Sequence, residues 1–246
     1  MKIFNKISFF LSLLVLFSFI ANNAFAAKGA ANVYKVTVYR LVFCDGDSTL
    51  ANCSNGDEVE YRAEGLTMDI ASVDAGAVAG SFGNLSKLTF GKTYSHGEVI
   101  LDRKFVIAGS GLSEDGEECQ TDSASGSAGT KSALGNGATG LTPATNEQTL
   151  YITNGSSLST NINGTTATDG TGTDGADGVV ASGDDYVKFR WAFAAPFTMK
   201  NTVPTMYIEF DVSEALGFYA QGELPCTGDS VSSEAPTMTN YFINWG

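Results

Sequence analysis

Apolar and polar residues alternate with a period of two along much of this chain, a pattern that predicts β-strands rather than helices. The longest such run is Asn32–Phe43 (NVYKVTVYRLVF), which is dense in β-branched and aromatic residues. Its face with Tyr34, Val36, Val38, Arg40 and Val42 is the more apolar, so we expect that face to be buried.

Shorter runs of the same kind predict further strands, and a serine start with a glycine stop predicts one helical turn at Ser213–Gly217. The further strands are expected at Val59–Ala63, Leu66–Ala71, Leu85–Phe90, Gly97–Gly109, Thr149–Thr153, Tyr186–Ala194, Thr205–Val212 and Asn240–Trp245.

Two segments of different composition interrupt these strands. Between about residues 110 and 148, and again between about 154 and 185, Gly, Ser, Thr, Ala and Asn dominate. Such segments bury little apolar surface, so we expect long loops there. The predicted fold class is all-β, an antiparallel β-sandwich or barrel of about eight or nine strands with long Gly/Ser/Thr-rich insertions.

The first 26 residues have the pattern of a secretory signal peptide. Lys2 and Lys6 precede an apolar run, Ile7–Ala21, and the small residues of NNAFA supply a cleavage motif. The apolar run is shorter than the roughly 20 residues that a membrane-spanning helix needs. We therefore predict a mature chain of residues 27–246 that forms a single domain, leaves the cytoplasm and has no integral membrane anchor.

The charge of the chain restricts its partners. The 246 residues carry a formal net charge of −13, and removal of the predicted signal leaves 12 basic and 27 acidic residues, a charge of −15. A surface this acidic repels nucleic acid and anionic lipid. We expect no nucleic-acid partner.

All four cysteines, Cys44, Cys53, Cys119 and Cys226, follow the predicted signal. An even number of cysteines in an exported chain predicts two disulfides, and four cysteines allow three pairings. We favour Cys44–Cys53, because CDGDSTLANC has the residues of a tight turn, which leaves Cys119–Cys226. A zinc site is the alternative, but Cys-x8-Cys without a second close pair or a nearby histidine is poor ligand spacing.

A glycine- and aspartate-rich stretch, TDGTGTDGADGVVASGDD (Thr168–Asp185), makes calcium the one candidate cofactor. Calcium takes about six to eight oxygen ligands, often from aspartates around a glycine turn. The candidate carboxylates are Asp169, Asp174, Asp177, Asp184 and Asp185. Thr171 and Thr173 stand where the EF-hand template needs aspartate or asparagine, so a solvated acidic loop is the preferred interpretation.

No catalytic motif stands out in the sequence. His96 is the single histidine and no G-x-S-x-G elbow occurs, so a Ser-His-Asp hydrolase is not indicated. Carboxylates are numerous, but no pair is singled out as in a glycosidase. The alternating aromatic residues Phe189, Trp191 and Phe193 are expected in the core. For Tyr241 and Trp245 near the C-terminus, stacking against a glycan stays an alternative. We expect no enzymatic activity.

Three stretches carry a resemblance: VYKVTVYRLVFC (Val33–Cys44), DIASVDAGAVAGSFG with FGKTYSHGEVILDRKFVI (Asp69–Gly83 and Phe90–Ile107), and VPTMYIEFDVSEALG (Val203–Gly217). They resemble a loose group of uncharacterised secreted β-rich proteins of marine bacteria, and this resemblance implies no activity.

The chain is also similar to chaperone–usher pilins, which export an alternating N-terminal strand with a cysteine near its end. That resemblance implies self-association by addition of a β-strand to the next subunit. The chain departs from the pilin pattern in two places. Cys53, the expected partner of Cys44, follows it closely, and Gly246 after Trp245 replaces the usual ending with a penultimate tyrosine.

The function predicted from these features is an exported, non-enzymatic structural or binding protein of the bacterial envelope or extracellular space. Its location would be periplasmic, cell-surface or extracellular. One alternative is a filament subunit or adhesin assembled by strand addition. The other is a glycan-binding module or carbohydrate-active enzyme that contacts a surface glycan.

Overall fold

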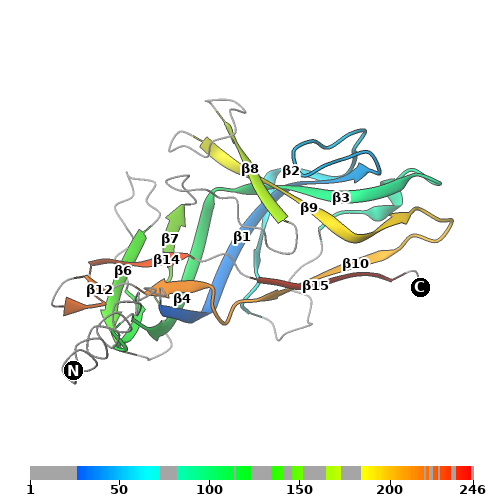
Figure 1. Ribbon diagram of the computed structural model, residues 1–246. Helices are drawn as coiled ribbons and strands as arrows, with labels where there is room; N and C mark the ends of the chain where they lie inside the picture. Colours follow the sequence, from blue (N-terminus) through cyan, green and yellow to red (C-terminus); the bar gives the residue numbers. More distant parts are fainter. Residues whose placement is uncertain are drawn as a thin grey trace, which may run out of the picture.

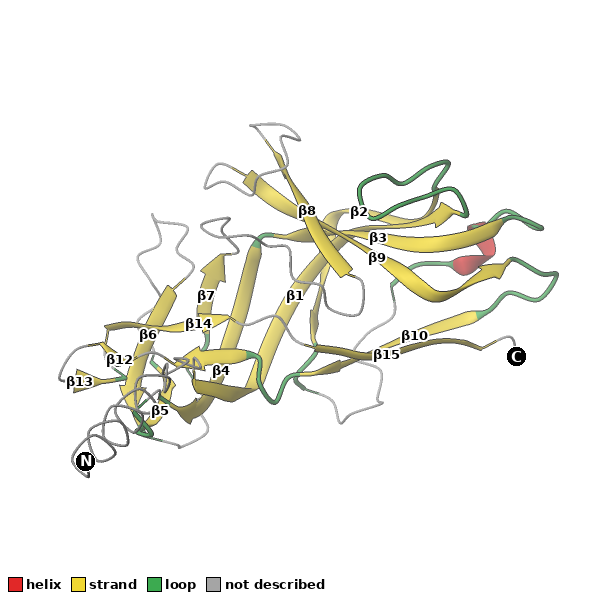
Figure 2. Ribbon diagram, in the orientation of Figure 1, coloured by secondary structure: helices red, strands yellow, loops and turns green. Residues whose placement is uncertain are grey.

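The computed structural model describes residues 27–72, 82–113, 115–122, 134–140, 146–151, 165–172, 184–218, 220–221, 224–226, 228–233 and 237–244. Antiparallel strands make up almost all of the regular structure, which confirms the all-β prediction (Figure 2). In chain order they are β1 (Ala27–Asp45), β2 (Asp57–Asp69), β3 (Thr93–Asp102), β4 (Lys104–Leu112), β5 (Glu118–Thr121), β6 (Leu134–Thr139), β7 (Gln148–Tyr151), β8 (Thr165–Gly172), β9 (Asp184–Thr198), β10 (Thr205–Asp211), β11 (Leu216–Phe218), β12 (Ala220–Gln221), β13 (Leu224–Pro225), β14 (Gly228–Ser233) and β15 (Thr237–Asn244).

Helix is confined, in the described ranges, to the 3-10 turn η2 (Leu85–Lys87). None of the described residues forms a helix long and apolar enough to cross a membrane.

Eleven strands join in one sheet with the order β7-β4-β5-β6-β14-β11-β1-β3-β9-β8, and β2 pairs with β1 beside this path (Figure 1). β10 and β15 form a separate two-stranded sheet, as do β12 and β13. The whole is an open, sandwich-like arrangement rather than a single closed barrel.

The long strand β1 connects the two ends of the molecule (Figure 1). Its first half pairs with β11 on one edge and β4 on the other, so that Gly29 lies opposite both Leu216 and Gly111. Its second half pairs with β2 and β3, so that Leu41 lies opposite both Glu60 and Val99. One strand therefore takes part in both hydrophobic cores.

The first core lies beside the N-terminal half of β1. There the pairings form a ring, because β4 pairs with β5, β5 with β6, β6 with β14, β14 with β11, β11 with β1, and β1 again with β4. The buried residues inside are Ala31, Tyr34, Ile70, Phe105, Ile107, Leu150, Ala215, Leu216, Phe218, Val231 and the bonded pair Cys119–Cys226.

The second core lies between the sheet β2-β1-β3-β9 and the smaller sheet β10-β15. Its buried residues are Phe43, Val59, Leu88, Tyr94, Trp191, Phe193 and Met199. β10 contributes to both cores, because Met206 and Ile208 pack against the second and Phe210 packs against the first. Trp191 and Phe193 are thus core residues as predicted, whereas Phe189 is only half-buried.

The burial of β1 differs from the prediction because its alternation changes phase. A one-residue bulge at Tyr39 separates Val38, opposite Leu101, from Arg40, opposite Ile100. Tyr34, Val38 and Val42 are buried as expected, but Val36 is only half-buried, and after the bulge Phe43 of the opposite face enters the second core. A single extra residue shifts a period-two pattern to the other face.

Two predicted elements are wrong. Leu85–Phe90 is not a strand: the side chain of Asn84 accepts a hydrogen bond from Ser86 N at 3.0 Å and starts the turn η2 instead. Ser213–Gly217 is not a helical turn, because the Asp211 carboxylate accepts from Ser213 N at 2.8 Å and the chain re-enters the sheet as β11. Local side-chain caps decide both cases.

Other boundaries also differ. The predicted strand Gly97–Gly109 is divided by Arg103 into β3 and β4. The predicted strands Val59–Ala63 and Leu66–Ala71 are parts of one irregular strand, β2. The segments expected to be loops contain β5 and β6 in the first case and β8 in the second. These strands are polar or glycine-rich, so their pairing comes from neighbouring backbone rather than from an apolar pattern.

Candidate functional site

Three loops meet at one end of the second core. They connect β1 with β2 (residues 46–56), precede β3 (residues 88–92) and connect β9 with β10 (residues 199–204). The last two are joined by hydrogen bonds from Gly91 N to Met199 O at 2.9 Å and from Met199 N to Lys92 O at 2.9 Å. We call these three loops the loop end; they lie at the right of Figures 1 and 2, on the side of the C-terminal strand.

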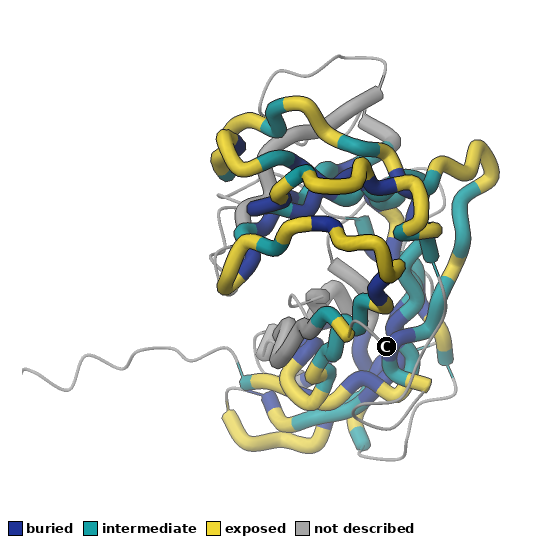
Figure 3. The backbone as a smooth tube through the Cα atoms, turned by 90° about the vertical axis from the view of Figure 1, so that its right-hand side faces the viewer, coloured by how far each residue is buried: buried dark blue, intermediate teal, exposed yellow. Residues whose placement is uncertain are grey.

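Figure 3 looks onto this end, and many of the loop positions nearest the viewer are exposed. Phe90 is 67% exposed and Val203 is 48% exposed. These are two of the four large hydrophobic side chains that are exposed in the described parts of the chain. The sequence pattern missed Phe90 as a surface residue because it assigned that position to a strand.

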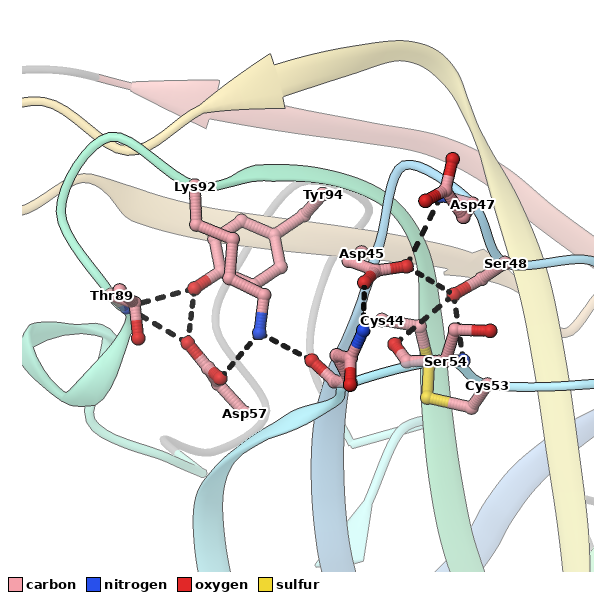
Figure 4. Close-up of polar contacts among 11 residues, drawn as sticks. Cys44, Asp45, Asp47, Ser48, Cys53, Ser54, Asp57, Thr89, Lys92 and Tyr94 are labelled. Carbon is pink, nitrogen blue, oxygen red and sulfur yellow. Dashed lines mark hydrogen bonds and ion pairs between the residues drawn. A yellow bond between two sulfur atoms is a disulfide. The ribbon is translucent and has the colours of Figure 1, made fainter.

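The loop from β1 to β2 is held in one shape by a disulfide and by side-chain hydrogen bonds (Figure 4). Cys44 and Cys53 are bonded, nine positions apart, as the sequence predicts; we call this the short-loop disulfide. The Asp45 carboxylate accepts hydrogen bonds from Asn55 Nδ2 at 2.9 Å and Asp47 N at 3.1 Å. The hydrogen bond from Asn55 is the main cause that lowers the pKa of Asp45. A charged carboxylate therefore organises the turn.

Asp57 anchors the turn before β3 in a second cluster (Figure 4). Its carboxylate lies 2.7 Å from Lys92 Nζ, accepts from Thr89 N at 2.9 Å and accepts from the Tyr94 hydroxyl. Burial alone would raise the pKa of Asp57, but the hydrogen bonds from Lys92, Tyr94 and Thr89 outweigh it and lower the pKa to about 2. Burial and then the contact with Asp57 raise the pKa of Tyr94. At neutral pH the aspartate is charged and the tyrosine is neutral.

A buried ion pair lies beneath the short-loop disulfide. Arg190 Nε donates to Glu98 Oε2 at 2.9 Å, and Arg190 Nη1 donates to Leu50 O at 2.7 Å. The guanidinium thus ties β9 and β3 to the loop above them. A Glu98 carboxylate oxygen also lies within 4.8 Å of the sulfur atoms of Cys44 and Cys53. Zinc binding needs thiolates, and the disulfide uses both sulfurs, so the zinc alternative is wrong at this pair.

The His96 side chain borders the same region without a catalytic arrangement. The Ser95 hydroxyl lies 2.7 Å from His96 Nδ1 and also donates to Asp45 O at 2.6 Å. A serine proton held by a main-chain carbonyl is not being passed to a histidine base. Burial, and secondarily the charge of Arg190, lower the pKa of His96, so its ring is neutral at pH 7. Ser95 and His96 are therefore best explained as structural residues that join β3 to the end of β1.

The residues predicted as a calcium site fall partly within the described ranges. Asp169 lies on β8 opposite Lys188 of β9, and Asp184 lies opposite Gly172. Four positions of β9 separate the two pairings, about 13 Å along a strand. Asp185 follows Asp184 in β9, whereas Asp174 and Asp177 lie outside the described residues. Calcium binding there stays a prediction.

The second predicted disulfide, Cys119–Cys226, is also present, with its sulfurs in the first core. We call it the long-loop disulfide, since 107 positions separate its cysteines. It ties β5 to the turn that follows β13, so it stabilises the ring of strands at the other end of the molecule.

Comparisons with known proteins give no relative for this chain: no family model, no curated protein and no solved structure matches it. The resemblances to secreted marine-bacterial proteins and to pilins therefore stay predictions, and the functional argument rests on the geometry alone.

Proposed function

We propose that this chain is an exported, non-enzymatic binding or structural protein whose loop end presents a fixed contact surface. The observation that carries the proposal is the loop end itself. The Asp57 cluster holds the loop that exposes Phe90, and backbone hydrogen bonds between Met199 and Gly91–Lys92 join to it the loop that exposes Val203. The short-loop disulfide and the Asp45 cluster hold the third loop beside them. Loops held rigid before binding lose less conformational entropy when a partner docks.

The compartment supports this role. Two disulfides indicate that the protein folds outside the reducing cytoplasm. Together with the signal-like first 26 residues, they favour export to the periplasm, the cell surface or the medium. The strongly acidic composition favours a partner that is not a polyanion.

The strand pairing at the start of β1 argues against the pilin-like alternative. A donor strand has to be free to enter the next subunit, but β1 is paired on both edges close to the predicted cleavage site. Ala27 lies opposite Phe218, and Gly29 lies opposite both Leu216 and Gly111. If cleavage follows Ala26, the start of the mature chain is already part of its own sheet, which favours a self-contained binding protein over N-terminal strand donation.

The test uses mature protein purified from a bacterial host and applied to envelope fractions. We expect wild-type protein to be retained, and the double variant Phe90→Ser/Val203→Ser to be retained several-fold less. Leu112→Ser is the matched control, because Leu112 is also 48% exposed but lies on β4, at the end of the first core. Equal retention of all three proteins would contradict a role for the loop end. Heat- and SDS-resistant polymers on gels would instead support assembly by strand addition.

A further inference from the structure

The sheet that covers the second core has an outer face of unusual composition. Core residues such as Phe43 and Trp191 lie on the inner face of β2, β1, β3 and β9, which run side by side in Figure 1. On the outer face the register aligns Tyr61 of β2, Arg40 of β1, Ile100 of β3 and Lys188 of β9 in one row. Asp102 of β3 and Tyr186 of β9 lie opposite each other in an adjacent row.

Irregular pairing brings one more tyrosine to this outer face. Tyr39 is the extra residue between the pairs Val38–Leu101 and Arg40–Ile100. The pairing with β2 is irregular at the same point. Val38 lies opposite Leu66 and Arg40 lies opposite Tyr61, so four residues of β2 (62–65) face the single residue Tyr39. Bulges often redirect a side chain and are enriched near functional sites. Here the bulge places two consecutive side chains, Tyr39 and Arg40, on one face.

The contacts of these side chains establish their orientation. The Tyr39 ring packs edge-on against the Tyr186 ring with centroids 4.7 Å apart, and its hydroxyl lies 3.4 Å from Asp102 Oδ2. Arg40 Nε donates to Glu58 Oε2 at 2.6 Å from the same face. Tyr61 is 60% exposed, and the other tyrosines are half-buried.

Gly65 fits this arrangement. It has a φ of +68°, and a Cβ atom there would lie 3.1 Å from Tyr39 Cε1 and 2.5 Å from Thr37 Cγ2. A side chain at position 65 would therefore displace the Tyr39 ring.

We propose that this outer face, formed by Tyr39, Arg40, Tyr61, Ile100, Asp102 and Tyr186, binds a neutral glycan chain; we call it the tyrosine face. Tyrosine offers a flat apolar ring and a polar hydroxyl in one side chain. Sugar rings have the complementary chemistry, with apolar C–H faces and hydroxyl edges. Arg40 supplies donors and Asp102 supplies acceptors beside the rings.

Charge and polarity select this class of partner over others. The net charge of −13 repels acidic polysaccharides and nucleic acids at long range. In the row that contains Arg40, this residue is paired with Glu58, and Lys188 of β9 lies opposite Asp169 of β8, so an acidic residue accompanies each of these two cations. Typical protein–protein interfaces are enriched in tyrosine and arginine but depleted of aspartate and glutamate. The tyrosine face instead has the carboxylates of Asp102 and Glu58 beside its rings, which suits a hydrated ligand. This inference does not depend on the loop end.

The test is affinity electrophoresis of the whole mature protein in native gels that contain one polysaccharide each. The neutral probes are a β-glucan, a mannan, a xylan and a galactan, and the anionic probe is alginate. We expect at least one neutral polymer to slow the wild-type protein and alginate not to do so. Tyr61→Ala should weaken that binding about tenfold, equivalent to about 1.4 kcal/mol. Because Tyr61 is exposed, this variant should keep the wild-type melting temperature.

Two further variants complete the test. Asp102→Asn should weaken binding while leaving the ring contact between Tyr39 and Tyr186 in place. Leu112→Ala, an exposed apolar residue on β4 that belongs to neither proposed surface, is the matched control and should bind like wild type. The proposal is overturned if no neutral polymer slows the protein, if only alginate slows it, or if Tyr61→Ala and Asp102→Asn migrate like wild type.

Discussion

Asp57→Asn is the most informative single change at the loop end. The substitution keeps the shape of the side chain but removes its charge. The Asp57 side chain is 17% exposed and accepts from Lys92 Nζ at 2.7 Å, from Thr89 N at 2.9 Å and from the Tyr94 hydroxyl. An asparagine amide offers one acceptor oxygen to these donors and turns an N–H group toward another of them.

The magnitude follows from the pKa of Asp57. Folding lowers this pKa from 3.8 to about 2. At about 1.4 kcal/mol for each pH unit, the charged carboxylate adds about 2 kcal/mol to the free energy of unfolding. Because the folded-state pKa is the lower one, this stabilisation is complete above the unfolded-state value and is lost as the pH falls through the folded-state value.

The assay is urea unfolding followed by tryptophan fluorescence between pH 7 and about pH 2.5. At pH 7 we expect Asp57→Asn to be about 2 kcal/mol less stable than wild type. Near pH 2.5 the difference should narrow to about one third of that, because a protonated aspartate resembles asparagine. Asp47→Asn, an exposed aspartate of the neighbouring loop, should stay within about 0.5 kcal/mol of wild type throughout. A difference that does not change with pH, or no difference at pH 7, would refute the reasoning.

Three further predictions concern packing and cross-links. Gly97→Ala should destabilise the protein by about 1–3 kcal/mol in the same unfolding assay, because a Cβ atom there would lie 2.3 Å from the Trp191 indole. Gly46→Ala, where the nearest atom to a new Cβ is 4.0 Å away, should cost far less, and equal costs would contradict this packing. Glu98→Gln leaves the Arg190 charge buried without its partner and should lower the free energy of unfolding by about 3–5 kcal/mol. A Glu98→Leu/Arg190→Met double variant removes both charges and should recover much of that stability. If the double variant recovers nothing, the loss is not a charge effect. Replacing both cysteines of the long-loop disulfide by serine should lower the free energy of unfolding by about 2 kcal/mol more than the same replacement at the short-loop disulfide. The reason is that the loop-closure entropy removed from the unfolded chain grows with loop length. A larger loss at the short-loop disulfide would contradict this explanation.

Much of the fold could be predicted from the sequence because its signals are local. The period-two pattern placed β1, β9, β10 and β15 within a few residues of their positions. Both disulfides were predicted from compartment and spacing, and both are present. The predictions failed where register decides the outcome. After the bulge at Tyr39, Phe43 of the opposite face enters the second core while Val42 stays buried, and nothing in the alternation marks the extra residue.

The candidate sites were harder to predict because their residues are distant in the sequence. Asp57 is 35 positions from Lys92, and Arg190 is 92 positions from Glu98. No spacing rule joins such pairs, so only the strand pairing brings them together. The tyrosine face is formed in the same way, by residues from four strands whose register was unknown. The most conspicuous pattern in the sequence is instead the glycine- and aspartate-rich stretch, which contributes part of β8 and the start of β9.

The central claim is that this protein leaves the cytoplasm and is locked by two disulfides. Intact-mass analysis of the protein from its producing cells, with non-reducing peptide mapping, tests this most directly. We predict a chain that begins at Ala27, contains no free thiol and yields cross-linked peptides for Cys44–Cys53 and Cys119–Cys226. A cytoplasmic protein that retains residues 1–26 and four free thiols would contradict the account.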